Sequence, residues 1–110
     1  MKNSKLVSLL SICRKAGKLT TGFDAVVESM QDAKARLVLL ACDLSDKTRS
    51  ELHFSAGKCQ YAGDILQTQQ TMDELSVVLS KRTGVLAITD AGLAQAILSE
   101  LSKQGGADRL

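Results

Sequence analysis

A chain of 110 residues, 45% of them apolar and 24% charged, can bury one hydrophobic core, which excludes a disordered or low-complexity protein. Its longest apolar run, residues 37–42, is far shorter than the roughly 20 residues that span a membrane, and we expect no secretory leader. The formal net charge of +2 is too small to identify a partner by itself.

The first helix and strand are indicated by residues 4–21. Apolar residues recur at steps of three and four, which predicts an amphipathic helix from about residue 4. Gly17 suits the left-handed position that ends a helix. Residues 18–21 then form a short extended piece, and Gly22 begins a second helix that points its apolar residues inward.

The middle of the chain alternates strands and helices. Residues 36–42 contain a continuous apolar run, which is typical of a strand buried on both faces. Ser45 can cap the third helix. Residues 61–66 are predicted to hold a shorter strand. They are followed by a capping box in which Thr71 and Glu74 bond the first N–H groups of a fourth helix.

The last part of the chain completes the alternation. Residues 85–88 are a further buried strand, and Asp90 caps the last helix. The order of elements predicts an α/β fold, a three-layer α/β/α sandwich with a central mixed four-stranded sheet. We expect a single domain over residues 1–103 and a flexible tail over residues 104–110. Periodicity does not determine strand order, so a doubly wound sheet stays an alternative.

Basic residues are concentrated at the start of the chain. Five of them precede the first acidic residue, Asp24, namely Lys2, Lys5, Arg14, Lys15 and Lys18. A basic segment on a near-neutral chain indicates a surface that faces a polyanion, although a solvated helix face has the same pattern.

Signatures of an enzyme are missing. The one histidine, His53, falls within a predicted helix and has no serine or cysteine partner evident in the sequence. Neither a glycine-rich dinucleotide motif nor a P-loop occurs, and the aspartates lack metal-ligand spacing. Cys13, Cys42 and Cys59 form no zinc pattern and indicate reduced thiols in the cytoplasm. We therefore expect no enzyme activity, cofactor, metal, small-molecule substrate or membrane association.

Two residues at the end of the strand within residues 36–42 have alternative interpretations. Asp43 follows this strand as the phosphoacceptor of a receiver domain does. Such a domain also needs an acidic pair after its first strand, and residues 18–21 supply none. Cys42 could act as a nucleophile, but no basic or histidine partner is close in sequence. The sequence favours a polar residue at the strand exit and a small buried thiol.

Three blocks carry a resemblance to a known family. Residues 9–22, LLSICRKAGKLTTG, match a helix, the pattern A-x-K-A-G-K and a strand that ends in glycine. Residues 35–45, ARLVLLACDLS, match A-K-L-V-I-I-A-x-D-x-S, and residues 85–94, VLAITDAGLA, match V-x-A-I-x-D-x-G-x-A. In this order and spacing, they resemble the ribosomal protein superfamily of L-seven-Ae and L-thirty-e, and most closely its short bacterial branch, called YlxQ-like.

The resemblance implies a three-layer α/β/α fold and recognition of kink-turn RNA. In the family, the motif G-x-N-E-x-x-K at the start of the second helix reads sheared G·A pairs, and the loop before the last strand covers splayed-out nucleotides. Aligned on Gly22, this chain has Asp24 at the Asn position, Ala25 at the Glu position and Glu28 at the Lys position. A carboxylate repels phosphate and an alanine side chain accepts no hydrogen bond, so we expect weakened or altered kink-turn recognition.

The cations and polar groups around that surface are the candidate RNA-binding residues, because each cation that contacts a phosphate adds salt-sensitive affinity. The set is Lys15, Lys18, Thr21, Gly22, Asp24, Lys34, Arg36, Lys81, Arg82 and Thr83. The expected partners are structured RNA and the ribosome or another ribonucleoprotein. The alternative is a protein-interaction adaptor on the same fold that has lost RNA binding.

Overall fold

Helices and strands alternate along residues 4–104, the part of the chain that the computed structural model describes. The helices are α1 (Ser4–Lys15), α2 (Phe23–Gln31), α3 (Asp46–Lys58), α4 (Met72–Leu79) and α5 (Ala91–Gln104). The strands are β1 (Leu19–Thr21), β2 (Leu37–Leu40), β3 (Asp64–Gln67) and β4 (Val85–Ile88). This is the order of elements that the sequence predicts.

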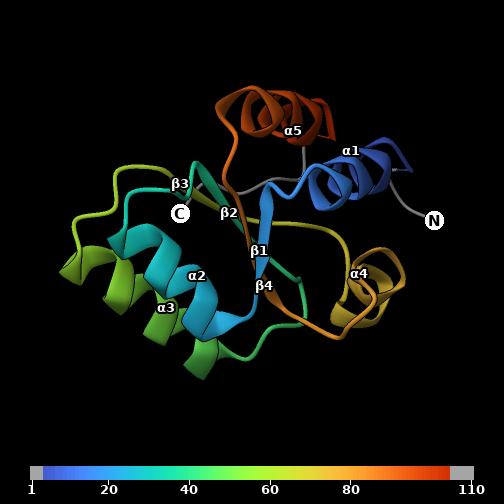
Figure 1. The fold of residues 1–110 in the computed structure, drawn as a ribbon. Helices are drawn as coiled ribbons and strands as arrows, with labels where there is room; N and C mark the ends of the chain where they lie inside the picture. The colour runs from blue at the N-terminus through green and yellow to red at the C-terminus, as the bar shows by residue number, and fades with distance from the viewer. Residues whose placement is uncertain (1–3, 105–110) are drawn as a thin grey trace.

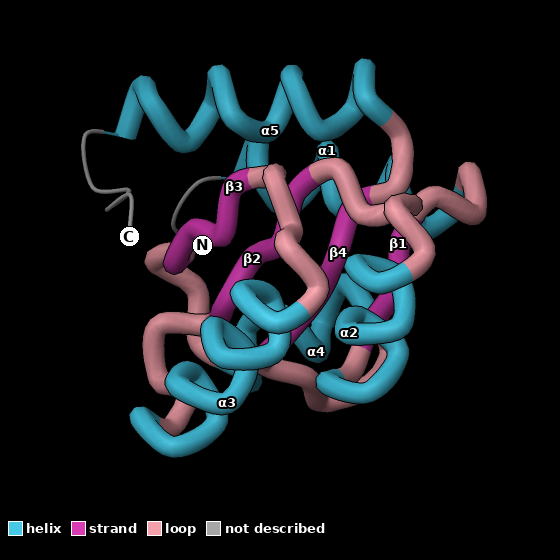
Figure 2. Tube along the Cα trace, turned by 90° about the vertical axis from the view of Figure 1, so that its left-hand side faces the viewer, coloured by secondary structure: helices cyan, strands magenta, loops and turns pink. Residues whose placement is uncertain are grey.

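The strands form one mixed sheet in the order β1-β4-β2-β3, which can be followed in Figure 2. Strand β4 pairs antiparallel with both β1 and β2, and β2 pairs parallel with β3. The predicted mixed four-stranded sheet is therefore confirmed, and the doubly wound alternative is wrong, because two of the three pairings are antiparallel. Strand β4, the last in the chain, lies inside the sheet, between the edge strand β1 and strand β2.

Two helical layers cover the sheet, and each has its own hydrophobic core. Helices α1, α4 and α5 lie on one face and α2 and α3 on the other (Figure 1). Leu10, Leu75 and Ile97 are fully buried on the first face, and Val26 and Leu52 on the second. Because side chains alternate along a strand, β2 and β4 contribute residues to both cores. The three-layer sandwich is thus confirmed.

The predicted helix starts are confirmed by their hydrogen bonds. The Ser45 hydroxyl accepts from the Thr48 N–H at the start of α3. Thr71 and Glu74 form both halves of the capping box on α4. The Asp90 carboxylate accepts from the Leu93 N–H at 2.9 Å. Each such cap contributes about 1 kcal/mol to stability.

Strand boundaries differ from the prediction more than helix starts do. Strand β3 begins at Asp64 rather than at residue 61. Tyr61 lies over Gly63, where a Cβ would collide with the phenol, so these residues form a packed turn instead of extended strand. Residues 1–3 of the expected domain and residues 105–110 of the expected tail lie outside the described residues.

Within the described part of the chain, none of the helices has the length and apolar character needed to span a bilayer.

Candidate functional site

Helix α2 starts at a glycine in a conformation that other residues rarely adopt. Gly22 has φ 96° and ψ 149°, and its N–H donates to the Val85 carbonyl at 2.9 Å. No side chain caps the helix. The first N–H groups of α2 therefore have no partner within the helix, and they carry the positive end of its dipole. This end of the helix can receive an anion.

The loop before β4 lies beside this helix start, because the hydrogen bond between Gly22 and Val85 joins the two segments. Lys81 and Arg82 are exposed, and Arg82 forms an ion pair of 3.0 Å with Asp73. Thr83 is buried instead, and its hydroxyl donates to the Val85 carbonyl at 3.0 Å. Thr83 thus shapes the loop rather than presenting a hydroxyl to solvent. We call this region the α2 start surface; it comprises Thr21, Gly22, Asp24, Lys81, Arg82 and Thr83.

Acidic side chains modify the α2 start surface. Asp24 lies exposed in the first turn of α2, where a carboxylate interacts favourably with the helix dipole. Glu28 is exposed one turn further along. Both carboxylates oppose the approach of a phosphate. The surface therefore combines attractive N–H groups and lysine or arginine side chains with local repulsion.

The remaining predicted cations lie at the other end of β4. Lys18 accepts a backbone hydrogen bond from Thr89 at 3.0 Å, and the Arg36 N–H donates to the Ile88 carbonyl at 2.7 Å. Lys34 follows the end of α2, and Lys15 is the last residue of α1. A strand of four residues separates the two groups by about 10 Å. The structure therefore divides the ten predicted residues between the two ends of β4.

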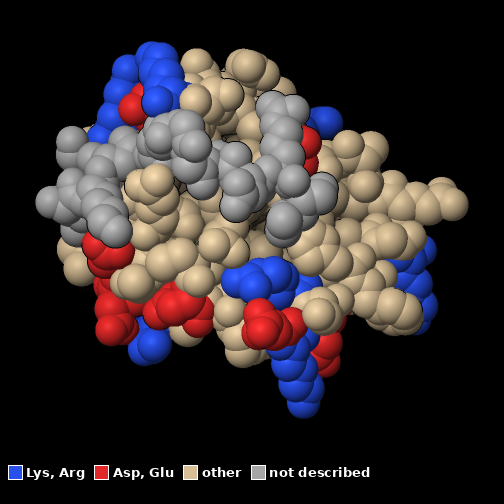
Figure 3. Space-filling view, turned by 180° about the vertical axis from the view of Figure 1, so that it is seen from behind, with Lys and Arg blue, Asp and Glu red and all other residues tan. Residues whose placement is uncertain are grey.

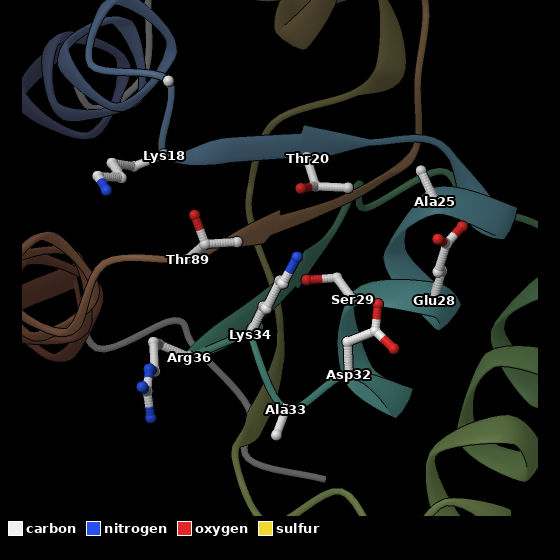
Figure 4. A pocket seen from close by; sticks show the side chains of 11 residues that line it. Lys18, Thr20, Ala25, Glu28, Ser29, Asp32, Ala33, Lys34, Arg36 and Thr89 are labelled. Atoms are coloured by element: carbon white, nitrogen blue, oxygen red, sulfur yellow. The ribbon is translucent and has the colours of Figure 1, made fainter.

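A pocket of about 580 Å³ opens at this second end, beside the edge strand β1. It is lined by α2, by Thr20 of β1, by Thr89 after β4 and by the turns at residues 17–18 and 33–36. Figure 4 shows Lys18 and Arg36 on one side, the carboxylates of Glu28 and Asp32 on α2 at the other, and Lys34 between them. We call it the edge pocket.

Several residues of the edge pocket were not among the sequence candidates: Thr20, Ser29, Asp32 and Thr89. Ser29 carries the one signal that could have been noticed, because it lies three residues after the buried Val26 and so on the inward side of the helix. The others come together only through the pairing of β1 with β4.

Charged side chains do not merge into one broad basic surface on the face shown in Figure 3. There, lysine and arginine side chains alternate with aspartate and glutamate side chains and are separated by uncharged residues. Charges of both signs are therefore mixed on this face.

The alternative sites considered from the sequence have structural roles. The Asp43 carboxylate accepts from the Met72 N–H at 2.9 Å and so caps α4. The Cys42 thiol donates a hydrogen bond to the Gln69 carbonyl at 3.5 Å. Burial raises the pKa of the Cys13 thiol, which disfavours its reactive thiolate. Among residues 4–104, no group of three or more His, Cys, Asp and Glu side chains is placed to hold a metal ion.

Proteins similar in sequence cover most of the chain. It is 36% identical over 87 residues to the large ribosomal subunit protein eL30 of Candida albicans. The matched region covers 77% of this chain and 80% of that protein. It is 30% identical over 106 residues to the RNA-binding protein YlxQ of Bacillus subtilis, which spans 92% of this chain and 99% of that protein. No model of a protein family matches the chain.

Solved structures agree in fold. A protein of unknown function from Bacillus halodurans superposes with a TM-score of 0.80 at 25% identity, over 91% of this chain and 99% of that one. The 15.5kD RNA binding protein of Giardia lamblia superposes with a TM-score of 0.70 at 17% identity, over 94% and 92%. By the sequence relatives and this shared architecture, the chain belongs to the L-seven-Ae/L-thirty-e family of ribosomal proteins, in its YlxQ-like branch.

Proposed function

We propose that this chain is a non-enzymatic RNA-binding protein of ribosomal type, and that it holds RNA on the α2 start surface. The observation that carries the proposal is a helix start without a side-chain cap, joined through Gly22 and Val85 to a loop with two exposed cations. The relatives eL30 and YlxQ, a ribosomal and an RNA-binding protein by name, support the same function. The expected setting is a cytoplasmic ribonucleoprotein.

The physical basis is attraction of phosphate to the start of α2. Free N–H groups and the dipole favour an anion there, and Lys81 and Arg82 add contacts whose strength falls with salt. The Arg82–Asp73 ion pair joins two exposed side chains, so it contributes at most about 1 kcal/mol and can give way to a phosphate. Base stacking is a minor contribution, because the chain has two phenylalanines, one tyrosine and no tryptophan.

Recognition of the kink-turn itself is expected to be weak or altered. Asp24 and Ala25 stand where the family has Asn and Glu, and Glu28 stands where it has Lys. All three side chains are exposed, so each would face the RNA without an intervening group. Ala25 offers no acceptor to a guanine edge, and the two carboxylates repel the neighbouring phosphates.

Restoring the family motif tests this proposal. The variant Asp24→Asn with Ala25→Glu and Glu28→Lys should bind a kink-turn RNA about tenfold tighter than the native chain does, relative to a duplex of the same length. Fluorescence anisotropy of labelled RNA measures both affinities. Glu100→Lys on α5 adds the same two positive charges on the opposite face and should raise both affinities equally. A restored variant without any kink-turn preference would contradict the proposed site.

A further inference from the structure

The edge pocket holds charges of both signs that do not neutralise one another. Lys18 and Arg36 lie on one side, Glu28 and Asp32 lie on α2 at the other, and Lys34 lies between them. Among the described residues, the ion pairs within 4.0 Å join other side chains, on α3 and between α4 and the loop before β4. The cations and carboxylates of the pocket therefore stay available to a ligand.

Backbone hydrogen bonds hold the walls of the pocket in place. The turn before β1 is joined to the exit of β4 by the Thr89 N–H, which donates to the Lys18 carbonyl. The turn after α2 is joined to the helix by the Lys34 N–H, which donates to the Ser29 carbonyl at 2.9 Å. A ligand would thus meet a site that is already formed, which lowers the entropic cost of binding.

One buried polar group of the pocket has no hydrogen-bond partner. Ser29 is only 6% exposed, and its hydroxyl oxygen lacks a partner. Figure 4 shows this hydroxyl pointing from α2 toward the Lys34 side chain, into the pocket. A buried hydroxyl without a partner is destabilising, and a hydrogen bond to a ligand group in the pocket would remove that cost.

The ligand must satisfy both sides of the pocket. A phosphate alone matches the cations but is repelled by Glu28, by Asp32 and by the negative end of α2. In an amino acid, the ammonium and carboxylate groups are attached to the same carbon atom. The cations and carboxylates of the pocket belong to different elements on either side of it, so an amino acid fits them poorly. A ribonucleotide has a phosphate at one end and hydroxyl and amino donors at the other. Carboxylates bind ribose hydroxyls in this way in dinucleotide sites.

We infer that the edge pocket binds one ribonucleotide. Its phosphate lies against Lys18, Lys34 and Arg36, its ribose hydroxyls donate to Glu28 and Asp32, and the Ser29 hydroxyl supplies a further hydrogen bond. The volume of about 580 Å³ falls within the range of small-molecule sites, about 300–1,000 Å³. This inference goes beyond the proposed function, because it assigns a ligand to the turns at residues 17–18 and 33–36, which are not part of the α2 start surface; Ala25 and Glu28, at two positions of the family motif, also line the pocket.

An NMR titration of the whole chain tests it. Guanosine 5′-monophosphate should shift the amide signals of Gly17, Ala33 and Thr89 saturably. The 2′-deoxy nucleotide should bind about tenfold more weakly, because it lacks the hydroxyl that a carboxylate accepts. Inorganic phosphate should bind more weakly still. Equal affinities for all three probes, or no saturable shift with the ribonucleotide, would overturn the inference.

Two variants separate the two sides of the pocket. Lys34→Ala should weaken the ribonucleotide about tenfold. Asp32→Asn should weaken the ribonucleotide but strengthen inorganic phosphate, a reversal that a general basic surface does not produce. Lys58→Ala, an exposed cation on α3, is the matched control and should change neither affinity. Well-dispersed amide spectra verify that each variant is folded. Unchanged affinities in both pocket variants would overturn the inference.

Competition identifies the source of the nucleotide. A single-stranded RNA octamer that displaces guanosine 5′-monophosphate would assign the pocket to a nucleotide within an RNA chain, and failure to compete would assign it to a free nucleotide. Both results require the pocket. Lys81→Ala with Arg82→Ala should leave nucleotide affinity unchanged, so loss of kink-turn binding and loss of nucleotide binding are distinguishable.

Discussion

Both ends of α2 connect the helix to the sheet through a residue with positive φ, but the residues differ: glycine at the start and alanine at the end. At the start, Gly22 has φ 96° and ψ 149°, a conformation that costs glycine nothing. At the end, Ala33 has φ 58°, a left-handed conformation that glycine would normally fill. Its N–H donates to the Met30 carbonyl and that of Lys34 to the Ser29 carbonyl, the hydrogen bonds of a Schellman motif.

The difference extends to charge. The start of α2 presents the positive end of the helix dipole and carries a carboxylate, Asp24. The end presents the negative end of the dipole and is followed by Lys34 and Arg36. Asp24 therefore partly offsets the dipole at the start, whereas at the end Lys34 and Arg36 offset it and the C-cap residue Asp32 adds to it. An anion at the start would meet backbone N–H groups, whereas at the end it would meet only side-chain cations.

The largest expected loss of stability comes from weakening the packing of α2 against the core. Met30 is 3% exposed and packs in the core between α2, α3 and the sheet, so Met30→Ala should cost about 2–5 kcal/mol of unfolding free energy. Urea denaturation measures this loss. Gln31→Ala, exposed on the next position, should change stability by less than about 0.5 kcal/mol. Equal costs for both changes would mean that α2 is not anchored as described.

The second largest expected effect on stability comes from the titration of the Tyr61 phenol, which lies near the end of α2. Burial, and then the neighbouring Asp64 carboxylate, raises the pKa of Tyr61 to about 12, whereas Arg36 lowers it. Because the folded chain holds this proton more tightly, the corresponding stability is present below pH 10 and is lost as the pH rises through 12.

Tyr61 is the one tyrosine in the chain, so tyrosinate absorbance reports it directly. Arg36→Ala should raise its pKa further, because the favourable cation is removed. A native chain that titrates with the ordinary pKa of 10 would contradict this environment.

Replacing the glycine at the start of α2 is a smaller, local change. Gly22→Ala forces a side chain into a conformation that only glycine adopts readily, at a cost of about 1–3 kcal/mol. It should weaken RNA binding and leave nucleotide binding in the edge pocket unchanged. Gly57→Ala is the matched control: it lies within α3, a Cβ there meets nothing within 4 Å, and it should stabilise by about 0.5–1 kcal/mol. Thermal unfolding compares the two.

The smallest effect is expected at the opposite end. Ala33→Gly relieves the left-handed strain and should stabilise the fold by about 0.5–1 kcal/mol, after the higher entropy of glycine in the unfolded chain is counted. The midpoint of urea denaturation measures it. A destabilised Ala33→Gly variant would show that the turn is not strained.

Most of the fold could be predicted from local sequence signals, because α3, α4 and α5 begin where side chains satisfy backbone N–H groups. Thr71 and Glu74 form the capping box that their spacing predicts. The start of β3 was missed because it depends on Tyr61 packing over Gly63, a contact that no periodicity encodes. Residue patterns report local geometry, whereas boundaries of this kind are determined by tertiary packing.

The sequence predicts candidate residues at both ends of β4: Gly22, Lys81 and Arg82 at one end, and Lys18, Lys34 and Arg36 at the other. The hydrogen bond between Gly22 and Val85 joins the start of α2 to the strand that follows the Lys81–Arg82 loop. That these cations share a pocket was not predictable, because Thr20 and Thr89 come together only through the pairing of β1 with β4, and the spacing of Ser29 from Val26 indicates an inward side chain but no pocket. An alanine, rather than a glycine, at position 33 also hides the turn that shapes this pocket.

The central claim is that the α2 start surface binds RNA, and a titration with salt tests it most directly. A labelled kink-turn RNA and a duplex of the same length are titrated with the native chain and with Lys81→Ala plus Arg82→Ala, at two salt concentrations. We predict salt-sensitive binding of the kink-turn RNA by the native chain. In the double variant, affinity should fall and the slope of log affinity against log salt should become shallower by about 2.

The control is Lys47→Ala with Lys103→Ala, which removes two exposed cations elsewhere and should keep the native affinity. No binding of either RNA at low salt would contradict the account and favour a protein partner.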